Sequence, residues 1–455
     1  MTLLDPMFGS EAVTKAFSDE ARLQRMLDFE AALAQAEARL GVIPGDAARA
    51  IAAECQVSKL DFDRIAHSAA DAGNLAIPLV AQLTVLVKKS DPEAARYVHW
   101  GATSQDVIDT GLILQVRDAL VPMMDSIDRL CALLAGLADR HRATPMVART
   151  WLQHAVPTVF GFKVAGWLDA MHRHRLRFDA MREHGLTLQF GGAAGTLASL
   201  GDRGLAVSQA LAAELQLGLP DLPWHAHRDR VAELGTTLAL CMGTLGKVAH
   251  DIALQSQTEV GELAEPEKTG RGGSSTMPHK RNSVNSALIL AAAQRVPGLT
   301  ATILTAMQQE HERGLGNWHA EWETLPEIFR LVGGALDRTV AVMDGLEVHA
   351  DRMLENLQLT RGLIFAEAAS MALASRVGKS EAHKIVEAAS RRAVLKGKHL
   401  ADMLAEDPQV TPHLSPKDVE AIFDSRSYRG EAERFIDRVL ATHLTIFKVT
   451  ATHQV

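Results

Sequence analysis

The chain has 455 residues, of which 47% are hydrophobic and 22% are charged, with a formal net charge of −8 at pH 7. This composition is globular and excludes a disordered or collagen-like chain, and the acidic balance disfavours nucleic acid as the main partner. Three widely spaced cysteines argue against a disulfide framework, and neither a signal peptide nor a run of about 18 apolar residues is found, so we expect a cytoplasmic protein without a membrane span.

The first clear helix is predicted at residues 18–40. Ser18 is a suitable N-cap, and apolar residues then recur at steps of three and four from Leu23 to Leu40, which gives one apolar face. Gly41 ends this helix.

Longer helices are predicted through the middle of the chain. Several exceed the mean of about 12 residues for globular helices, and they are rich in alanine and leucine, which suits a bundle of long, closely packed helices. The stretch at 238–254 is apolar on nearly every side, so it must be buried on nearly every side, which favours an obligate oligomer. The predicted long helices span residues 109–140, 156–184, 229–263, 284–311 and 325–356.

The predicted fold class is all-α, because alternating strand patterns are scarce. Weak boundaries divide the chain into three predicted domains. These are an N-terminal helical domain at 1–108, a central long-helix bundle at 109–355 and a C-terminal helical domain at 356–455.

The most informative segment is the loop at 270–285, with the sequence GRGGSSTMPHKRNSVN. Its glycines, serines and proline exclude a helix, although it lies between two long predicted helices. Two interpretations stay open from composition alone. The loop is either a solvated linker with basic residues, or a mobile lid that offers a hydroxyl, backbone N–H groups and cations to an anion.

Within this loop, GSSTMPHKRN resembles the signature sequence of the fumarase/aspartase superfamily, GSSxMPxKxN. The resemblance implies that Ser274 is the general base that takes a proton from the carbon next to a carboxylate. It also implies that Lys280 and Asn282 hold that carboxylate, with Met277 beside the substrate. A nest of N–H groups and a nearby cation would lower the pKa of the serine hydroxyl, and Lys280 would stabilise the aci-carboxylate that forms.

Two further segments resemble the other motif regions of this superfamily. The segment HWGATSQDVIDT, which begins at His99, resembles the first region. That likeness implies that Thr103 and Ser104 are carboxylate-binding hydroxyls and that Asp106 is structural. The segment TWLQHAVPTVFG resembles the second region, with Gln153 as a hydrogen-bond donor to the substrate. Three matches in the right order along one helical chain argue against coincidence.

The chain departs from many relatives where they place a general acid. Adenylosuccinate lyase and fumarase have Thr-His in the second region, whereas this chain has Trp151 there. Trp151 is a candidate for substrate binding, and a simple packing role for it stays open. Adenylosuccinate lyase also uses a histidine of its first domain, and the matching place here, around Gly73 and Asn74, has none. Expulsion of an amine or hydroxide needs general-acid help worth about 10²–10⁴ in rate, so we infer a leaving group that is already good.

A carboxylate is such a leaving group, since the pKa of its conjugate acid is about 4. The superfamily contains a lactone-forming cycloisomerase branch, which expels a carboxylate in the elimination direction. In the lactone-forming direction, it closes a carboxylate of an acyclic carboxymuconate onto the diene of the same molecule. The stretch EHERGLGNWHAEWE at 310–323 resembles that branch, as does the continuation of the loop by Ser283. The expected function is therefore lactonisation of a tricarboxylate in aromatic catabolism, with the substrate's own carboxylate as nucleophile.

A substrate with three negative charges needs concentrated positive charge in an acidic protein. His99, His154 and Arg313 lie near the three motifs and are candidates for binding it, although most of the 19 histidines must be structural or exposed. The GGAAGT turn at 191–196 lacks a preceding strand and a Lys-Ser or Lys-Thr ending, so it fails as a phosphate loop. We expect it to be a turn between helices that edges the site.

The resemblance also implies a homotetramer in which the motifs of one active site come from different subunits, without a metal or another cofactor. The expected partner is a small-molecule tricarboxylate, and neither nucleic acid nor a membrane is expected. Two alternatives stay open. An adenylosuccinate lyase-like elimination is disfavoured by the missing histidine pair, and a non-catalytic scaffold is disfavoured by the intact signature loop.

Overall fold

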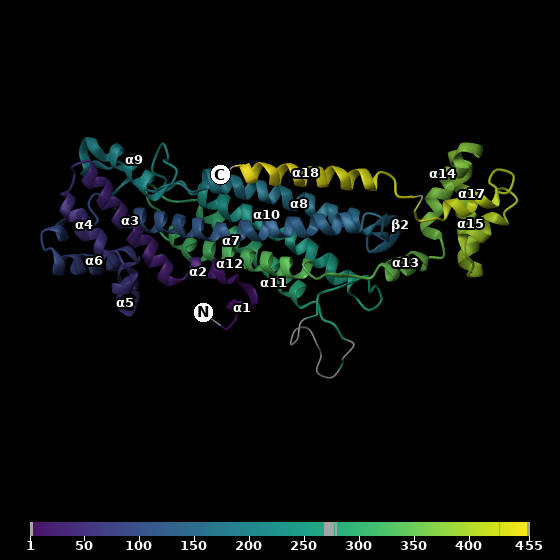
Figure 1. Cartoon of the computed structure of the whole chain (residues 1–455), viewed down its shortest axis with the longest axis horizontal. Coiled ribbons are helices and arrows are strands. Elements are labelled where there is room, and N and C mark those ends of the chain that lie inside the picture. The colour runs from purple at the N-terminus through teal and green to yellow at the C-terminus, as the bar shows by residue number, and fades with distance from the viewer. Residues whose placement is uncertain (1–2, 268–276, 278–279, 427, 453–455) are drawn as a thin grey trace. The chain divides into compact units, whose positions relative to one another are not determined.

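In the computed structural model, the chain is mostly helical over the described residues, with two short antiparallel sheets (Figure 1). The described residues are 3–267, 277, 280–426 and 428–452, with side chains as far as Phe447. The strands are β1 (Pro145–Thr150), β2 (Gln153–Val159), β3 (Leu263–Ala264) and β4 (Glu347–Val348). The helices are α1 (Asp5–Phe8), α2 (Glu11–Ala16), α3 (Asp19–Arg39), α4 (Gly45–Glu54), α5 (Phe62–Ala72), α6 (Ala76–Ser90), α7 (Ser104–Arg140), α8 (Phe160–Ala180), α9 (Gly204–Leu215), α10 (Asp229–Gln255), α11 (Val284–Ala306), α12 (Asn317–Met343), α13 (Ala350–Gln358), α14 (Ala366–Val377), α15 (Lys379–Lys396), α16 (Leu400–Ala405), α17 (Pro416–Ile422) and α18 (Ala432–Thr452).

Contacts between residues divide the chain into two compact units. The boundary between them falls within the long helices α7, α8, α10, α11 and α12. The predicted three-domain layout stays a prediction. The first unit comprises residues 1–127, 174–246 and 288–338, and the second comprises 128–173, 247–287 and 339–455.

In the first unit, α3 forms as its sequence predicts. The Ser18 Oγ accepts a 3.1 Å hydrogen bond from the backbone N–H of Ala21, which caps the helix. The apolar face with Leu23, Met26 and Leu33 is buried, and α3 packs against α4 and α9, while α6 packs on α4 (Figure 1). The prediction of this helix is therefore confirmed.

One acidic side chain of α3, Glu37, is fully buried, and neither of its carboxylate oxygens has a hydrogen-bond partner among the described residues. Burial, together with the nearby Glu30 carboxylate, raises the pKa of Glu37 from 4.5 to about 8. The folded chain therefore binds this proton more tightly than the unfolded chain does. The resulting stability is complete at a pH below the unfolded pKa and is lost as pH rises through the folded pKa.

We therefore expect Glu37→Gln to stabilise the chain more at pH 9 than at pH 6, because glutamine carries no charge at either pH. A pKa difference of this size corresponds to several kcal/mol, since one unit is about 1.4 kcal/mol. Urea-induced unfolding followed by circular dichroism at both pH values measures the difference. Glu20→Gln, at an exposed position of the same helix, is the control. Equal effects of Glu37→Gln at both pH values would contradict the prediction.

A buried ion network in the first unit connects residues of α7 and α12 through Arg228. The guanidinium donates from Nη1 and Nη2 to Asp109 at 2.7 and 3.0 Å, and from Nε to Glu321 at 3.0 Å. Trp318 Nε1 also donates to Asp109, at 3.0 Å. The three charged side chains are each 1% exposed. Burial by itself lowers the pKa of Arg228, but the two carboxylates more than offset this and raise it, so the guanidinium stays charged.

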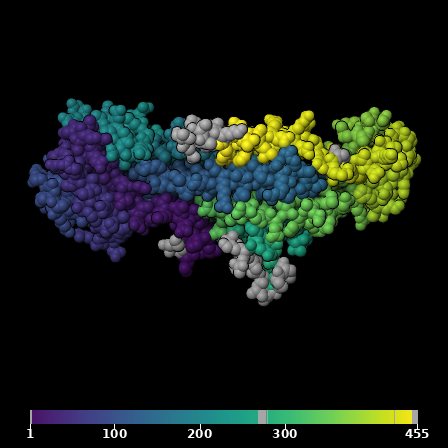
Figure 2. All heavy atoms as spheres, in the orientation of Figure 1, coloured from purple at the N-terminus to yellow at the C-terminus, as the bar shows by residue number. Residues whose placement is uncertain are grey.

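In the second unit, the C-terminal helices α14, α15, α16 and α17 pack around one apolar cluster that includes Leu373, Ile385 and Leu400. Figure 2 shows this part as one packed body of green and yellow spheres. The last helix, α18, runs beside α8, since the rings of His172 and His443 stack with their centroids 5.4 Å apart.

Several helix limits differ from those predicted. The helix expected from residue 156 begins at Phe160 as α8, because residues 153–159 pair with β1 as a strand. The helices α10 and α11 end early, at Gln255 and Ala306. The helix expected at 325–356 is replaced by α12, the short strand β4 and a separate α13.

Among the described helices, α11 is long and apolar enough to cross a membrane by length and composition. Its most apolar window has a mean hydropathy of 1.4, and 28% of that window is buried within the chain. A single helix of this kind is weak evidence, because core helices of soluble proteins meet the same criterion. The expected absence of a membrane span stays a prediction.

Candidate active site

The first group of candidate residues lies at the N-terminus of α7, in the first unit. Asp106, in the first turn, is fully buried and accepts five hydrogen bonds. Its donors include the backbone N–H of Thr103 at 3.0 Å, two amides of the turn at 191–192 at 3.0 and 2.9 Å, and His225 Nε2 at 2.7 Å. The prediction that Asp106 is structural is confirmed in this sense, because its carboxylate joins the Thr103 segment to the glycine turn.

Arg313 lies beside Thr103 in the same unit. Its Nη2 donates to Thr103 Oγ1 and to the Ala193 carbonyl oxygen at 3.1 Å each, and its Nε donates to Gln105 Oε1 at 3.1 Å. The loop that carries Arg313 lies between α11 and α12. A guanidinium, a hydroxyl and the positive end of a long helix thus meet at one place, which suits an anion.

The other residues of this first motif are less clearly placed for a ligand. Ser104 opens α7 and is partly exposed. His99 has a positive φ of 60°, and its Nδ1 lies 2.6 Å from Glu30 Oε1. Burial by itself lowers the pKa of His99, but the Glu30 carboxylate more than offsets this and raises it. The Nδ1 of His99 is therefore occupied within the chain, and Glu30 is a partner that sequence reasoning did not find.

The second motif forms the hairpin of β1 and β2 in the second unit. Thr150 pairs with Gln153, so Trp151 and Leu152 form a two-residue turn, with φ of 52° and 63°. A turn with two positive φ values usually holds Asn-Gly, so two bulky residues there are strained. Trp151 is 98% exposed. Within the described residues, Trp151 therefore does not pack in the core of its own chain.

A buried ion pair anchors this hairpin close to its turn. Arg149 donates to both oxygens of Glu262 at 2.9 and 2.6 Å, and Asn356 donates to Glu262 at 2.8 Å. His154 lies opposite Arg149 on β2, and its buried Nδ1 has no partner among the described residues. Burial, and then the Arg149 charge, lower the pKa of His154, so the ring is neutral near pH 7. Gln153 is exposed next to it.

The third motif is only partly described. Residues 268–276, with the predicted base Ser274, lie outside the described residues, whereas Met277, Lys280 and Asn282 are described and exposed. The end of the loop is fixed to the second unit by Arg281, which donates to Glu347 at 2.8 and 2.6 Å.

Glu265 fixes the start of the helix that follows this loop. Its two carboxylate oxygens accept from the backbone and side chains of Asn285 and Ser286 at 2.7 to 3.0 Å, which caps the N-terminus of α11. Neither Glu265 nor the Glu262 pair was found by sequence reasoning. The signal that could have found them is their place in the sequence, as acidic residues just before a glycine-rich basic loop.

The structure thus brings Thr103 and Arg313 together in the first unit. Separately, it places Trp151, Gln153 and His154 on one hairpin in the second. Within the described residues, no group of three or more His, Cys, Asp or Glu side chains is placed to hold a metal ion. The expected absence of a metal or another cofactor stays a prediction.

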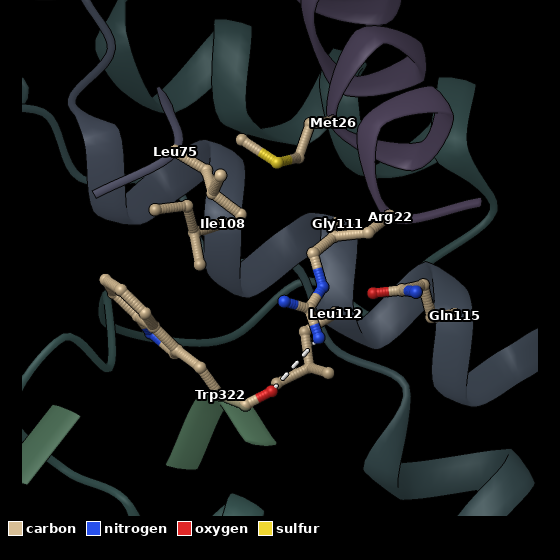
Figure 3. Close-up of a pocket in the computed structure, with 8 residues that line it drawn as sticks. All are labelled: Arg22, Met26, Leu75, Ile108, Gly111, Leu112, Gln115 and Trp322. Carbon is tan, nitrogen blue, oxygen red and sulfur yellow. Dashed lines mark hydrogen bonds between the residues drawn. The ribbon is translucent and has the colours of Figure 1, made fainter. Parts of the chain in front are cut away.

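A small pocket lies in the first unit (Figure 3). Its lining is mostly apolar, and Arg22 Nη2 donates across it to the Trp322 carbonyl oxygen at 3.2 Å. The volume of the pocket that the centre of a water molecule can reach is about 20 Å³. One or two waters need this much, so the pocket is too small for a tricarboxylate. Its lining residues are Arg22, Met26, Leu75, Ile108, Gly111, Leu112, Gln115 and Trp322.

Comparison with known proteins gives agreement along most of the chain. Residues 9–298 match a family model described as lyase, and residues 362–439 match one described as adenylosuccinate lyase C-terminus. The chain is 53% identical over 438 residues to a 3-carboxy-cis,cis-muconate cycloisomerase from Bradyrhizobium diazoefficiens, covering 96% of this chain and 97% of that protein. It is 52% identical over 441 residues to a protein of the same name from Pseudomonas aeruginosa, covering 97% of this chain and 96% of that one. The crystal structure of 3-carboxy-cis,cis-muconate lactonizing enzyme from Pseudomonas putida matches with a TM-score of 0.94 at 48% identity, covering 98% of this chain and 99% of that one.

Proposed function

Because the chain belongs to the lyase family, within the fumarase/aspartase superfamily, we propose that it converts 3-carboxy-cis,cis-muconate into 4-carboxymuconolactone. The observation that carries the proposal is Trp151 at the exposed tip of the hairpin, where many relatives have a histidine that serves as general acid. Lactonisation needs no such acid, because the substrate's own carboxylate is the nucleophile. The relatives of about 50% identity that carry the cycloisomerase name support the same conclusion.

In the proposed reaction, a carboxylate oxygen of the substrate forms a C–O bond to the diene. The electron pair of the attacked double bond moves towards a neighbouring carboxylate, which becomes an aci-carboxylate. Ser274 delivers a proton to the carbon next to that carboxylate, and the serine regains its proton from solvent. Lys280 and Asn282 hold the aci-carboxylate, and the positive charge of Lys280 stabilises it.

The other carboxylates of the substrate are assigned to the two described groups. Thr103, Ser104 and Arg313 bind one of them at the N-terminus of α7, where the helix dipole and the guanidinium both favour an anion. Gln153 donates to another, with His154 beside it. His99 and Met277 complete the proposed set of contacts.

The proposed active form is a cytoplasmic homotetramer with active sites shared between subunits. In support, only 28% of the most apolar window of α11 is buried within one chain. Trp151 and Leu152 expose 98% and 74% of their surface, and exposed apolar groups of this size are typical of interaction sites. Three free, buried cysteines fit a reducing compartment.

Ultraviolet absorbance of 3-carboxy-cis,cis-muconate, incubated with the pure protein and no added metal, tests the proposal. We expect the diene absorbance to fall at an enzymatic rate, and a parallel cuvette with adenylosuccinate to stay unchanged. Reaction of adenylosuccinate alone would replace the proposal with an elimination and would require another role for Trp151. Reaction of neither substrate would leave the superfamily assignment but remove the proposed activity.

A further inference from the structure

We infer that Gln105 is a positioning residue that fixes the Arg313 guanidinium for a substrate carboxylate, an inference that rests on the proposed function. Gln105 lies in the first turn of α7 and is fully buried. Its Nε2 donates to the His225 carbonyl oxygen at 2.9 Å and to Asp109 Oδ2 at 3.1 Å. Its Oε1 accepts from Arg313 Nε at 3.1 Å. Every one of these partners belongs to the first unit.

The amide of Gln105 has one orientation that satisfies all three partners. In the reversed orientation, its oxygen would face a carbonyl and a carboxylate, and its NH₂ group would face a cation. Asp109 is in turn held by Arg228 and by Trp318 in the buried ion network. Gln105 therefore fixes the partly exposed Arg313 relative to the rigid, buried ion network.

This connection matters because an arginine has five N–H donors in one rigid plane. Three of them are engaged in the chain, one by Gln105 and the others by Thr103 and the Ala193 carbonyl oxygen. The two donors on Nη1 make no hydrogen bond with any described residue. Three fixed bonds to a planar group leave it no freedom to turn, so the direction of the Nη1 pair is set.

The hydrogen bond from Arg313 also orients the hydroxyl group of Thr103. Its Oγ1 already accepts from Arg313, so its hydroxyl hydrogen points elsewhere, and its backbone N–H is held by Asp106. The Nη1 donors of Arg313 and the Thr103 hydroxyl together form a two-point site that suits one carboxylate. Gln105 touches neither the proposed substrate nor the reacting atoms, and it acts through Arg313.

A double-mutant cycle tests the inference, with steady-state kinetics on 3-carboxy-cis,cis-muconate. A hydrogen bond to a charged group is worth about 1.5–3 kcal/mol, so we expect Gln105→Leu to raise KM about ten- to a hundredfold with a smaller change in kcat. In the Arg313→Ala background, the same substitution should change KM less than about twofold, because the group through which it acts is gone. Multiplicative effects of the two substitutions would overturn the inference.

Gln115→Leu is the matched control, because Gln115 is another buried glutamine of α7 and donates to the Ala16 carbonyl oxygen at 2.9 Å. It should lose as much stability in urea as Gln105→Leu but keep its KM. Gln105→Met, which keeps the unbranched shape, replaces the leucine variant if that variant does not fold. If neither folds while Gln115→Leu does, Gln105 serves the fold and the inference is wrong.

Binding of propane-1,2,3-tricarboxylate separates this inference from the proposed function. This compound has three carboxylates and no diene, so its affinity, measured by calorimetry, does not depend on turnover. If the protein does not convert the muconate but binds the tricarboxylate more weakly after Gln105→Leu, the proposed function fails and the role of Gln105 stands. Unchanged affinity in Gln105→Leu, with loss of affinity in Arg313→Ala, would overturn the role of Gln105 alone.

Discussion

Replacing Arg228 with methionine is expected to lower the free energy of unfolding by about 3–5 kcal/mol, because it leaves two buried carboxylates without their cation. Asp109 and Glu321 are each 1% exposed and depend on the same guanidinium. Burial raises the pKa of Glu321 even though the Arg228 charge lowers it, so loss of the arginine leaves the effect of burial unopposed. Methionine fills much of the space of the arginine side chain. The loss of stability therefore reflects the unpaired charges more than a cavity.

The urea midpoint at fixed chain concentration measures this loss, since the proposed assembly would make stability depend on chain concentration. Arg49→Met is the matched control. Arg49 is 77% exposed and pairs with Asp46, which is 82% exposed, so its loss should cost less than about 1 kcal/mol. A change for Arg228→Met as small as that of the control would show that the network contributes little.

Replacing Ser274 with alanine is expected to lower kcat by about 10²–10⁴, which is the usual contribution of a positioned proton-transfer group. In the proposed mechanism, the substitution removes the hydroxyl that delivers the proton but keeps Lys280 and Asn282. The affinity for propane-1,2,3-tricarboxylate should therefore change little. This combination separates loss of proton transfer from loss of binding.

Ser275→Ala is the control, since it removes the neighbouring hydroxyl of the same glycine-rich loop. We expect it to keep kcat within about tenfold of the unsubstituted enzyme, well short of the loss for a proton-transfer group. Stopped-flow absorbance of the muconate at saturating concentration measures both variants. Near-normal turnover by Ser274→Ala would remove this serine from the mechanism.

Local sequence signals predicted the elements that depend on neighbouring residues. The N-cap at Ser18 and the apolar face of α3 are confirmed, because a cap and a helical period are both set within a few residues. The signature loop carried the family assignment, although its serine lies outside the described residues.

The hairpin of β1 and β2 was missed, and part of it was predicted as helix. Its turn has Trp151 and Leu152 where a glycine or asparagine would have signalled the hairpin. The contacts of Gln105 were missed for a different reason. Its partner Arg313 is 208 residues away in the sequence, and no local pattern connects the two positions.

The strained turn at Trp151 and Leu152 has a consequence for engineering. Asn-Gly at these two positions would relieve the left-handed strain, and a search for thermostable variants would be drawn to that exchange. It would also remove the side chain that occupies the general-acid position of the relatives. In the proposed function, Trp151 stands beside Gln153, which binds a substrate carboxylate, so the exchange would trade activity for stability within one dipeptide.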